Sequence, residues 1–180
     1  VISEEMTKIA LGKRALLRIS DVAFEEWPEH LEGLKREVEV FHSDRSPIHL
    51  VENCHTIDRC EEVIDQHCAV FGVKLVAVDY LQLLSGRGSN RYENVTEISM
   101  RLKKAALRNN CALLTLCQLN RGIDSRENHE PKLSDLRESG QIEQDADLVI
   151  FGQWAWKVDP KIDPGVYYFY FAKNRNRGIN

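Results

Sequence analysis

An aspartate follows directly on an apolar run in this sequence. Residues 75–78 read Leu-Val-Ala-Val, and Asp79 comes next. A continuous apolar run is typical of a parallel strand that is covered on both faces, and ligands of open α/β sheets bind at the carboxyl ends of the strands. A carboxylate at that edge suits Mg²⁺ with nucleotide phosphates, because hard cations prefer carboxylate oxygens. An aspartate that caps a turn is the alternative interpretation.

Gln118 ends a second apolar run, which covers residues 111–117. We therefore expect Gln118 at the same edge of the sheet as Asp79. A neutral amide at that place can sense a γ-phosphate or orient a water molecule. An ordinary glutamine at a strand end is the alternative.

The elements that position these residues alternate along the chain. Apolar runs bounded by turn residues predict strands at 48–53, 73–79, 111–117, 147–154 and 166–174. Helical spacing predicts helices at 7–19, 22–40, 94–109 and 138–145, and one that opens at Thr56. Residues 85–91 and 119–136 are polar loops. This order predicts an α/β fold with a mostly parallel sheet flanked by helices, and the final two strands can form a hairpin.

Composition narrows the class of protein. The 180 residues are 43% hydrophobic and carry a formal net charge of -4, which suits one globular domain and not a basic nucleic-acid-binding tail. Any nucleic acid must therefore be bound by local basic loops. We expect a cytoplasmic protein with no membrane segment and reduced cysteines. A metal site among Cys54, His55, Cys60, His67 and Cys68 fits no common zinc spacing.

Two longer runs carry a resemblance to a known family. "VDYLQLL" (78–84) and "LCQLNRGIDSRENHEPKLSDLRESGQIEQDADLVIF" (116–151) resemble the motor domain of the DnaB-type hexameric replicative helicases. The likeness extends from "ISEEM" to "KNRNRG", and its part "SDLRESGQIEQDADL" is long and specific. It implies a RecA-like core that hydrolyses ATP between the subunits of a ring and pulls single-stranded DNA through the centre. RecA-like recombinases and clock-type ATPases lack that run.

The resemblance assigns roles to three residues of the sheet edge. Glu5 in "SEEM" matches the catalytic glutamate that polarises the attacking water, and its neighbour Glu4 stands where the family usually has an apolar residue. Asp79 matches the residue that holds Mg²⁺, directly or through water. Gln118 matches the residue that links the state of the γ-phosphate to the DNA loops.

Two cations lie near the end of the last strand. Lys173 and Arg175 are two residues apart, so their side chains should share one face of a strand. In the family a Lys-Gln-Arg triplet at this place reaches into the nucleotide of the neighbouring subunit, and here Asn174 replaces the glutamine. An exposed basic strand end is the alternative interpretation. Arg177 would project in the same direction.

DNA contacts are expected from two loops. The first contains Arg87 and Arg91, with glycines that leave the backbone mobile. In the second, Arg137, Glu138 and Gly140 match family residues that hold the backbone of single-stranded DNA. Such contacts give affinity without sequence choice. The resemblance also implies a homo-hexamer, a primase and a helicase loader as partners, and a place in a bacterial or phage replisome at the nucleoid.

The phosphate-binding loop of such a motor, G-x-x-x-x-G-K-[ST], does not occur in this sequence. Family order puts it before "ISEEM", so we interpret residues 1–180 as a partial RecA-like motor domain. The loop and the amino-terminal domain would then lie upstream. We expect negligible ATP hydrolysis by these 180 residues alone. A nucleotide-dead module that binds single-stranded DNA or caps a ring is the alternative.

Overall fold

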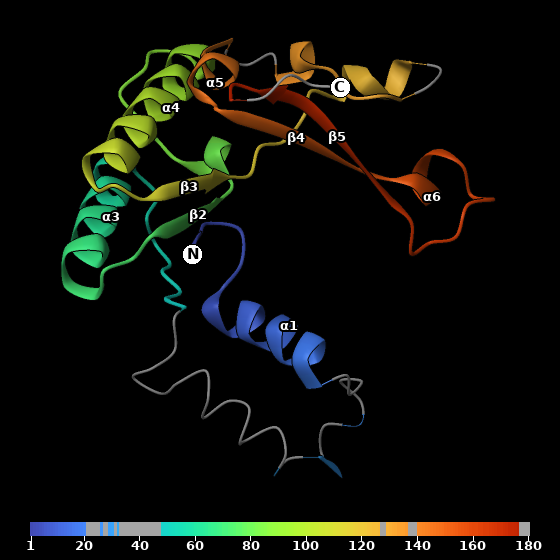
Figure 1. Ribbon diagram of the computed structural model, residues 1–180, viewed down its shortest axis with the longest axis horizontal. Helices are drawn as coiled ribbons and strands as arrows, with labels where there is room; N and C mark the ends of the chain where they lie inside the picture. Colours follow the sequence, from blue (N-terminus) through green and yellow to red (C-terminus); the bar gives the residue numbers. More distant parts are fainter. Residues whose placement is uncertain are drawn as a thin grey trace.

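Figure 1 shows the computed structural model of the chain, which describes residues 1–20, 26, 29, 30, 32, 48–126, 129–136 and 140–176. The helix predicted at 22–40 lies largely outside the described residues, as do Arg137, Glu138 and Arg177.

A parallel sheet forms the centre of the molecule. Its strands are β1 (Ile2–Ser3), β2 (Leu75–Asp79) and β3 (Ala112–Thr115), in that spatial order. The strand predicted at 48–53 is wrong, because within it only Val51 forms a bridge, to Ile2. Val51 pairs along the outer edge of β1, and a two-residue strand offers no partner for a longer run.

Helix α3 (Ile57–Phe71) begins and ends at residues suited to these places. The Thr56 side chain accepts a hydrogen bond from the Arg59 N–H at 3.2 Å, as its position before the helix predicts. Gly72 follows the last turn with a φ of 66°, a left-handed conformation that favours glycine. The helix predicted to open at Thr56 is therefore confirmed.

Helix α4 (Arg91–Arg108) begins three residues earlier than the prediction of 94. The reason is Asn90, whose Oδ1 atom accepts the Glu93 N–H at 2.9 Å and so satisfies a free donor of the first turn. Together α3 and α4 cover one face of the sheet. The buried core between them includes Ile57, Ile64, Val76, Val78, Val95, Ile98 and Leu102.

Helix α1 (Lys8–Ser20) follows β1 and confirms the helix predicted at 7–19. The Thr7 hydroxyl accepts the Ala10 N–H at 3.2 Å at its start. Figure 1 places α1 below the sheet, away from α4. No helix among the described residues is both long and apolar enough to span a membrane.

The chain leaves β3 through two short 3₁₀ turns, η3 (Arg121–Ser125) and η4 (Leu133–Leu136), and then forms helix α5 (Gly140–Asp145). Strands β4 (Leu148–Trp154) and β5 (Tyr167–Asn174) pair antiparallel, with the short helix α6 (Ala155–Val158) between them. The predicted hairpin is confirmed. One of its faces packs on the 3₁₀ turn η4 and on α5 through a small core that includes Leu136, Val149 and Phe151.

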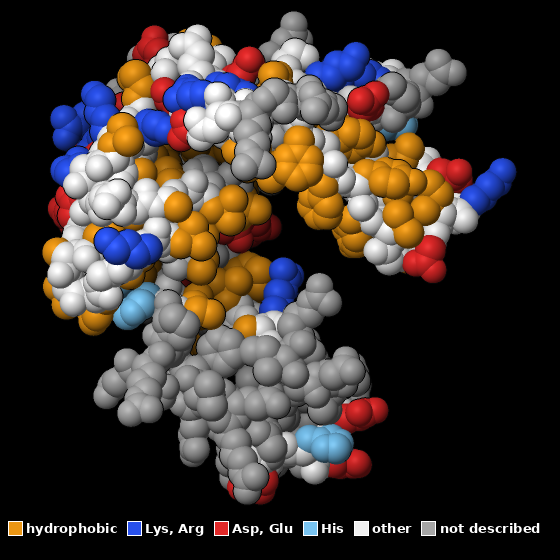
Figure 2. All heavy atoms as spheres, in the orientation of Figure 1, with side chains coloured by type: hydrophobic (Ala, Val, Ile, Leu, Met, Phe, Trp, Pro, Cys, Tyr) orange, Lys and Arg blue, Asp and Glu red, His pale blue; other side chains and the backbone are white. Residues whose placement is uncertain are grey.

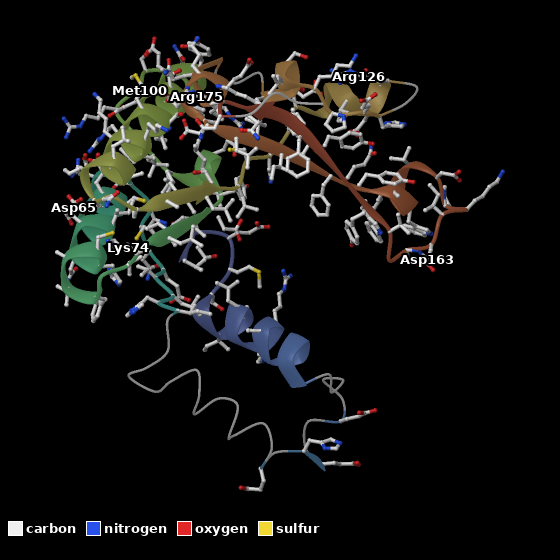
Figure 3. The ribbon with its side chains drawn as sticks, in the orientation of Figure 1. Asp65, Lys74, Met100, Arg126, Asp163 and Arg175 are labelled. Carbon is white, nitrogen blue, oxygen red and sulfur yellow. The ribbon has the colours of Figure 1, made fainter. Side chains whose placement is uncertain are left out.

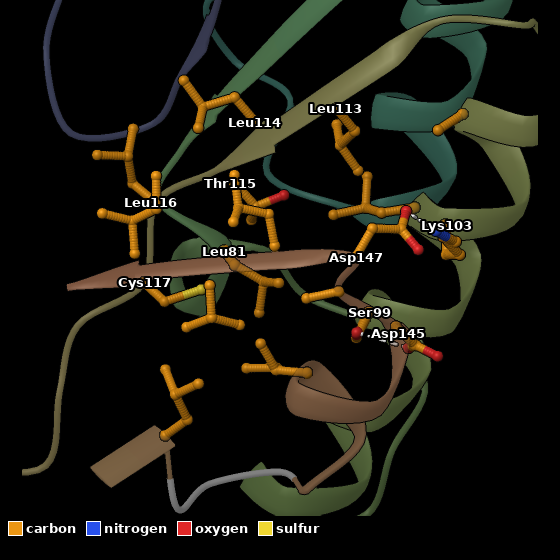
Figure 4. Close-up of a pocket in the computed structure, with 18 of the residues that line it drawn as sticks. Leu81, Ser99, Lys103, Leu113, Leu114, Thr115, Leu116, Cys117, Asp145 and Asp147 are labelled. Carbon is orange, nitrogen blue, oxygen red and sulfur yellow. Dashed lines mark hydrogen bonds and ion pairs between the residues drawn. The ribbon is translucent and has the colours of Figure 1, made fainter. Parts of the chain in front are cut away.

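The parallel sheet and the hairpin are separate sheets in the described part of the chain. A cavity of about 740 Å³ lies between β3 and β4 and is also lined by residues of α4 and α5, as Figure 4 shows. The edges of β3 and β4 that face this cavity make no strand pairing among the described residues. The predicted mostly parallel sheet is therefore present, with a gap before its last two strands.

The described residues leave one face of both sheets uncovered. Figure 2 shows hydrophobic side chains along the hollow between the hairpin and the rest of the molecule. Large apolar residues of the four strands β2 to β5 and the segment after β3 are 45–66% exposed: Leu75, Leu114, Leu116, Leu148, Ile150, Phe169 and Phe171.

Candidate functional site

The carboxyl ends of the three parallel strands meet at one edge. Ser3 lies beside Asp79 in the register of β1 and β2, and the Glu4 N–H donates to the Asp79 carbonyl at 2.9 Å. On the other side of β2, the Leu116 N–H donates to the Val78 carbonyl at 3.0 Å. The topology therefore brings the segments that carry Glu5, Asp79 and Gln118 to a common edge, which the apolar runs predict for Asp79 and Gln118.

Asp79 and Glu5 both present carboxylates that no described residue neutralises. Asp79 is half-buried at the end of β2, and Glu5 is exposed in the turn after β1. Neither side chain takes part in a hydrogen bond or ion pair with the described part of the chain. Carboxylates without internal partners at a sheet edge are free to bind a hard cation or a water molecule.

Glu4, the neighbour of Glu5, has a contrasting environment. Its side chain is only 2% exposed. Its Oε1 atom accepts the Cys54 N–H at 2.6 Å, and its Oε2 atom lies 2.6 Å from Nδ1 of His55. In the sequence Glu4 stands out only as an unusual residue for its position, since nothing nearby shows that residues about fifty positions away enclose it.

Gln118 is held through its backbone and not through its side chain. The Gln82 side chain donates to the Gln118 carbonyl at 3.1 Å and accepts the Gln118 N–H at 3.2 Å. The Gln118 side chain is exposed and remains free to contact a ligand at the edge. Gln82 was not predicted as a site residue, and its only sequence signal is its place just after Asp79.

Lys173 and Arg175 lie apart from that edge, on the hairpin beside α5. The Lys173 ammonium donates to the Glu143 carbonyl, and the Arg175 guanidinium binds Asp147 at 2.7 Å and the Gln144 carbonyl at 2.6 Å. The two cations therefore point the same way, as their spacing predicts, and Figure 3 shows Arg175 near α5.

A bulge decides which way these cations point. The register of β4 and β5 shifts between Val149 and Ile150, so that Val149 faces Lys173 and Ile150 faces Phe171. One extra residue moves the following side chains to the other face of a strand. Lys173 thereby leaves the uncovered face, where Phe171 lies, and reaches α5.

Asp147 carries a second cation besides Arg175. Lys103 of α4 binds its Oδ2 atom at 2.5 Å. The hydrogen bond from Lys103 is the largest cause of a lowered pKa for Asp147, and the charge of Arg175 adds to it. Asp147 thus stays ionised and joins α4 to the end of β5.

The glycine loop at residues 85–90 is folded back on α4. The Gly86 N–H donates to Asn94 Oδ1 at 2.6 Å, and the Arg87 N–H donates to Glu97 Oε2 at 2.6 Å. A Cβ atom on Gly88 would lie 2.3 Å from the Asn94 backbone nitrogen. These glycines permit a close approach of the loop to the helix. The mobility of the loop backbone stays a prediction.

The side chains of the two arginines of this loop are exposed. Arg87 is 79% exposed, and its guanidinium contacts Asp58 at 3.4 Å, a weak pair in solvent. Arg91 is the first residue of α4 and is also exposed. Gly140, from the second predicted DNA loop, is exposed at the start of α5, whereas Arg137 and Glu138 lie outside the described residues.

A buried ion pair organises the loop that leads from β3 to the hairpin. Asp135 is 5% exposed and is bound by the Arg126 guanidinium through both of its oxygens. The Lys132 N–H also donates to Asp135 at 2.8 Å. The hydrogen bonds from Arg126 lower the pKa of Asp135 most strongly. Neither partner was predicted, since the pair forms only when this loop closes on itself.

No group of three or more metal-binding side chains occurs within the residues that the structure describes. Cys54 and Cys60 are buried, and burial is the main cause that raises the pKa of the Cys60 thiol to about 12.

The fold and the sheet edge define a class, the RecA-like ATPase core. One solved ATPase domain superposes on the chain with a TM-score of 0.86 at 26% identity, covering 99% of this chain and 68% of that one. A DnaB-like replicative helicase, solved in a study of its interactions with primase, superposes with a TM-score of 0.79 at 28% identity, covering 97% of this chain and 45% of that one.

The family follows from the sequence comparison. The model of the DnaB-like helicase C-terminal domain matches residues 1–179, and the chain belongs to this family. The replicative DNA helicase DnaC of Bacillus subtilis is 46% identical over 83 residues, which are 44% of this chain and 18% of the relative. The replicative DNA helicase DnaB of Mycoplasma pneumoniae is 43% identical over 100 residues, 53% of this chain and 21% of the relative. The aligned part thus spans about a fifth of these relatives.

Proposed function

We propose that these residues form part of the motor of an ATP-driven replicative DNA helicase, which moves on single-stranded DNA and separates the duplex. The match of residues 1–179 to the helicase family carries this proposal. The common edge of Glu5, Asp79 and Gln118 supports it, because an ATPase needs a water-positioning group, a metal anchor and a phosphate sensor in one place.

Each edge residue has a role that fits its environment. The exposed Glu5 would orient and polarise the attacking water. The Asp79 carboxylate would hold the Mg²⁺ that accompanies ATP, and its lack of an internal partner in the described part of the chain fits that metal. Bound Mg²⁺ supplies charge neutralisation at the phosphates. Gln118, with its backbone clamped by Gln82, would contact the γ-phosphate through its free amide.

The phosphate-binding loop is proposed to lie upstream of Val1. The gap between β3 and β4 supports this, since both strand edges face a cavity of about 740 Å³ without pairing in the described part of the chain. A parallel strand placed there would join the two sheets and end near the edge that carries Asp79. The 68% coverage of the similar ATPase domain leaves room for such a segment.

Lys173 and Arg175 are proposed to act on the nucleotide of a neighbouring subunit in a homo-hexameric ring. Their place on the hairpin, away from the edge of their own chain, supports action across an interface. Arg175 is 47% exposed, so a neighbour can reach it. Asp147 would hold the guanidinium in position until the neighbour binds. An arginine supplied in this way accelerates phosphoryl transfer by about 10³–10⁵.

Single-stranded DNA is proposed to contact Arg87, Arg91, Arg137, Glu138 and Gly140. The exposure of Arg87 in the glycine loop and of Arg91 at the start of α4 supports a contact to phosphates. Primase and a helicase loader are the proposed protein partners, in the cytoplasm at a replication fork. The interaction of the DnaB-like neighbour with primase supports the first of these.

The test is the ATPase activity of the full-length protein, with and without single-stranded DNA. We expect DNA-stimulated turnover that is lost in Glu5→Gln and in Arg175→Ala, while the 180-residue chain alone turns over negligibly. Mixing inactive Glu5→Gln with inactive Arg175→Ala should restore part of the activity, because some interfaces then pair an intact Glu5 with an intact Arg175. An inactive full-length protein that still binds single-stranded DNA would overturn the motor in favour of a nucleotide-dead binding module.

A further inference from the structure

Glu4 is a buried carboxylate in the turn that presents Glu5. Its side chain is 2% exposed, and the Cys54 N–H donates to its Oε1 atom at 2.6 Å. The Oε2 atom receives no well-aligned hydrogen bond from any described residue, and Nδ1 of the 70% exposed His55 lies 2.6 Å from it. Burying a carboxylate is unfavourable unless it is paired and hydrogen-bonded.

Stability alone does not explain this arrangement. A carboxylate that leaves water is stabilised only where hydrogen bonds replace that water, and the Oε2 atom of Glu4 receives none that is well aligned from the described residues. The pair of Glu4 and His55 does, however, join two segments that are fifty residues apart. The contact therefore serves to hold the turn after β1 in place, and the side chain that this turn presents is the adjacent Glu5.

The turn around Glu5 is fixed from three sides. The Ser3 hydroxyl accepts the Met6 N–H at 3.1 Å, and the Glu4 N–H donates to the Asp79 carbonyl at 2.9 Å. The Glu4 side chain supplies the third attachment, to Cys54 and His55. Glu5 lies between these attachments with its own side chain exposed. The direction of the Glu5 carboxylate thus depends on where the segment 53–56 lies.

The same segment is attached to the base of the glycine loop. The Ser85 N–H donates to the His55 carbonyl at 2.8 Å, and the Ile57 N–H donates to the Ser85 carbonyl at 2.9 Å. Thr56 and Ser85 form a parallel bridge. Ser85 is the first residue of the loop that carries Arg87. A movement of this loop would therefore shift His55 and, through Glu4, the turn of Glu5.

We infer that Glu4 and His55 are positioning residues that transmit the state of the loop at residues 85–90 to Glu5. The inference rests on the proposed ATPase function, in which Glu5 orients water and Arg87 contacts DNA. It assigns to the 53–56 segment the role of a link between the DNA-binding loop and the water-positioning glutamate. Neither positioning residue touches the nucleotide.

The experiment compares Glu4→Gln, His55→Ala and the double variant in the full-length protein. Glutamine keeps the shape of the buried side chain and an acceptor for the Cys54 N–H but removes its charge. We expect each single variant to lower the DNA-stimulated kcat by about ten-fold or more, because small misplacements of a reacting group can reduce rates about 10²-fold. The KM for ATP and the affinity for single-stranded DNA should stay within about two-fold.

Two further results identify a shared role. The double variant should be no slower than the slower single variant, since both changes break one link and contacting residues are not additive. His55→Arg, which keeps a hydrogen-bond donor at this exposed position, should retain part of the stimulation that His55→Ala loses. Glu62→Gln on α3, whose side chain is 67% exposed, is the matched control and should resemble the unmodified protein.

Two outcomes would contradict the link between the loop and Glu5. Full DNA stimulation in both single variants, or effects that multiply in the double variant, would overturn the link. Glu4→Gln could act by lowering the melting temperature. In that case the DNA-stimulated kcat of His55→Ala tests the link, because the His55 side chain is exposed and its removal leaves no void. Failure of the proposed function shows elsewhere: the unmodified protein would then lack ATPase activity, or Glu5→Gln would keep it.

Discussion

The two faces of the parallel sheet differ in what covers them. On one face, Val76 and Val78 are buried beneath α3 and α4 together with Ile98 and Leu102. On the other face, Leu75, Leu114 and Leu116 are about half exposed or more, and the hairpin continues this surface with Ile150 and Phe171. The residue types are alike on both faces, so composition does not distinguish them.

This difference shows which part of the fold is complete in the described residues. The covered face has a contiguous core and caps at the start of both helices. The uncovered face is apolar over four strands, and extended exposed apolar surface usually marks a contact with another segment or partner. It borders the gap between β3 and β4, where the proposed upstream strand would lie. Substitutions on each face test this difference.

The largest expected effect is in the covered core. Ile98→Ala removes a side chain that is 0% exposed and leaves a cavity. We expect the free energy of unfolding to fall by about 2–5 kcal/mol. Urea unfolding of the 180-residue chain, followed by circular dichroism, measures it. A change below about 1 kcal/mol would mean that this side of the sheet is no better packed than the other.

A smaller effect is expected where the glycine loop meets α4. In Gly88→Ala the new methyl group would collide with the Asn94 backbone nitrogen, which lies 2.3 Å from the position of the Cβ atom. We expect a loss of about 1–3 kcal/mol, typical of overpacking against backbone. Gly122→Ala is the control, because its Cβ atom would meet no atom closer than 3.6 Å. Equal stability of the two variants would contradict a loop packed this closely on α4.

The buried Asp135 should produce a pH-dependent effect in the loop between the two sheets. Its pKa is lowered, chiefly by the hydrogen bonds from Arg126, so the ionised group stabilises the fold above its unfolded pKa of about 3.9. Asp135→Asn should lose about 1–2 kcal/mol at pH 7. The difference from the unmodified chain should shrink as the pH falls below about 4, towards the lowered folded pKa. Urea midpoints at pH 7 and pH 3 test this, and a constant difference would refute it.

The smallest effect is expected on the uncovered face. Leu114 is 55% exposed, so Leu114→Ala should change the stability of the 180-residue chain by less than about 0.5 kcal/mol. In the full-length protein the same substitution should cost about 2–5 kcal/mol if upstream residues cover this face. The measurement is the difference between the two proteins. A small effect in both would remove the support that this face gives to the proposed upstream segment.

The sequence predicted most elements correctly because their signals are local. Thr56 before an apolar stripe predicted the start of α3, and the runs before Asp79 and Gln118 predicted β2, β3 and the polar edge. The paired aromatic strand at the end predicted the hairpin. The strand at 48–53 failed because pairing depends on a partner, and β1 is only two residues long.

The structure shows the positions of the described site residues, but it does not test their assigned roles. The resemblance supplied the roles of Glu5, Asp79 and Gln118, and these remain predictions for the proposed experiments. The placement of Asp79 and Gln118 at one edge followed from the direction of parallel strands. The contacts of Arg175 could not be predicted, because its partner Asp147 precedes β4 and meets it only through the antiparallel pairing.

The order of the elements, the apolar runs that end on polar residues and membership of the helicase family can all be read from the sequence. The burial of Glu4 against Cys54 and His55, the packing of the glycine loop on α4 and the bulge that turns Lys173 towards α5 depend on the folded chain. The physical reason is the range of the interactions. Caps and strand runs depend on neighbours within a few residues, whereas burial, ion pairing and strand register depend on segments that meet only in the folded chain.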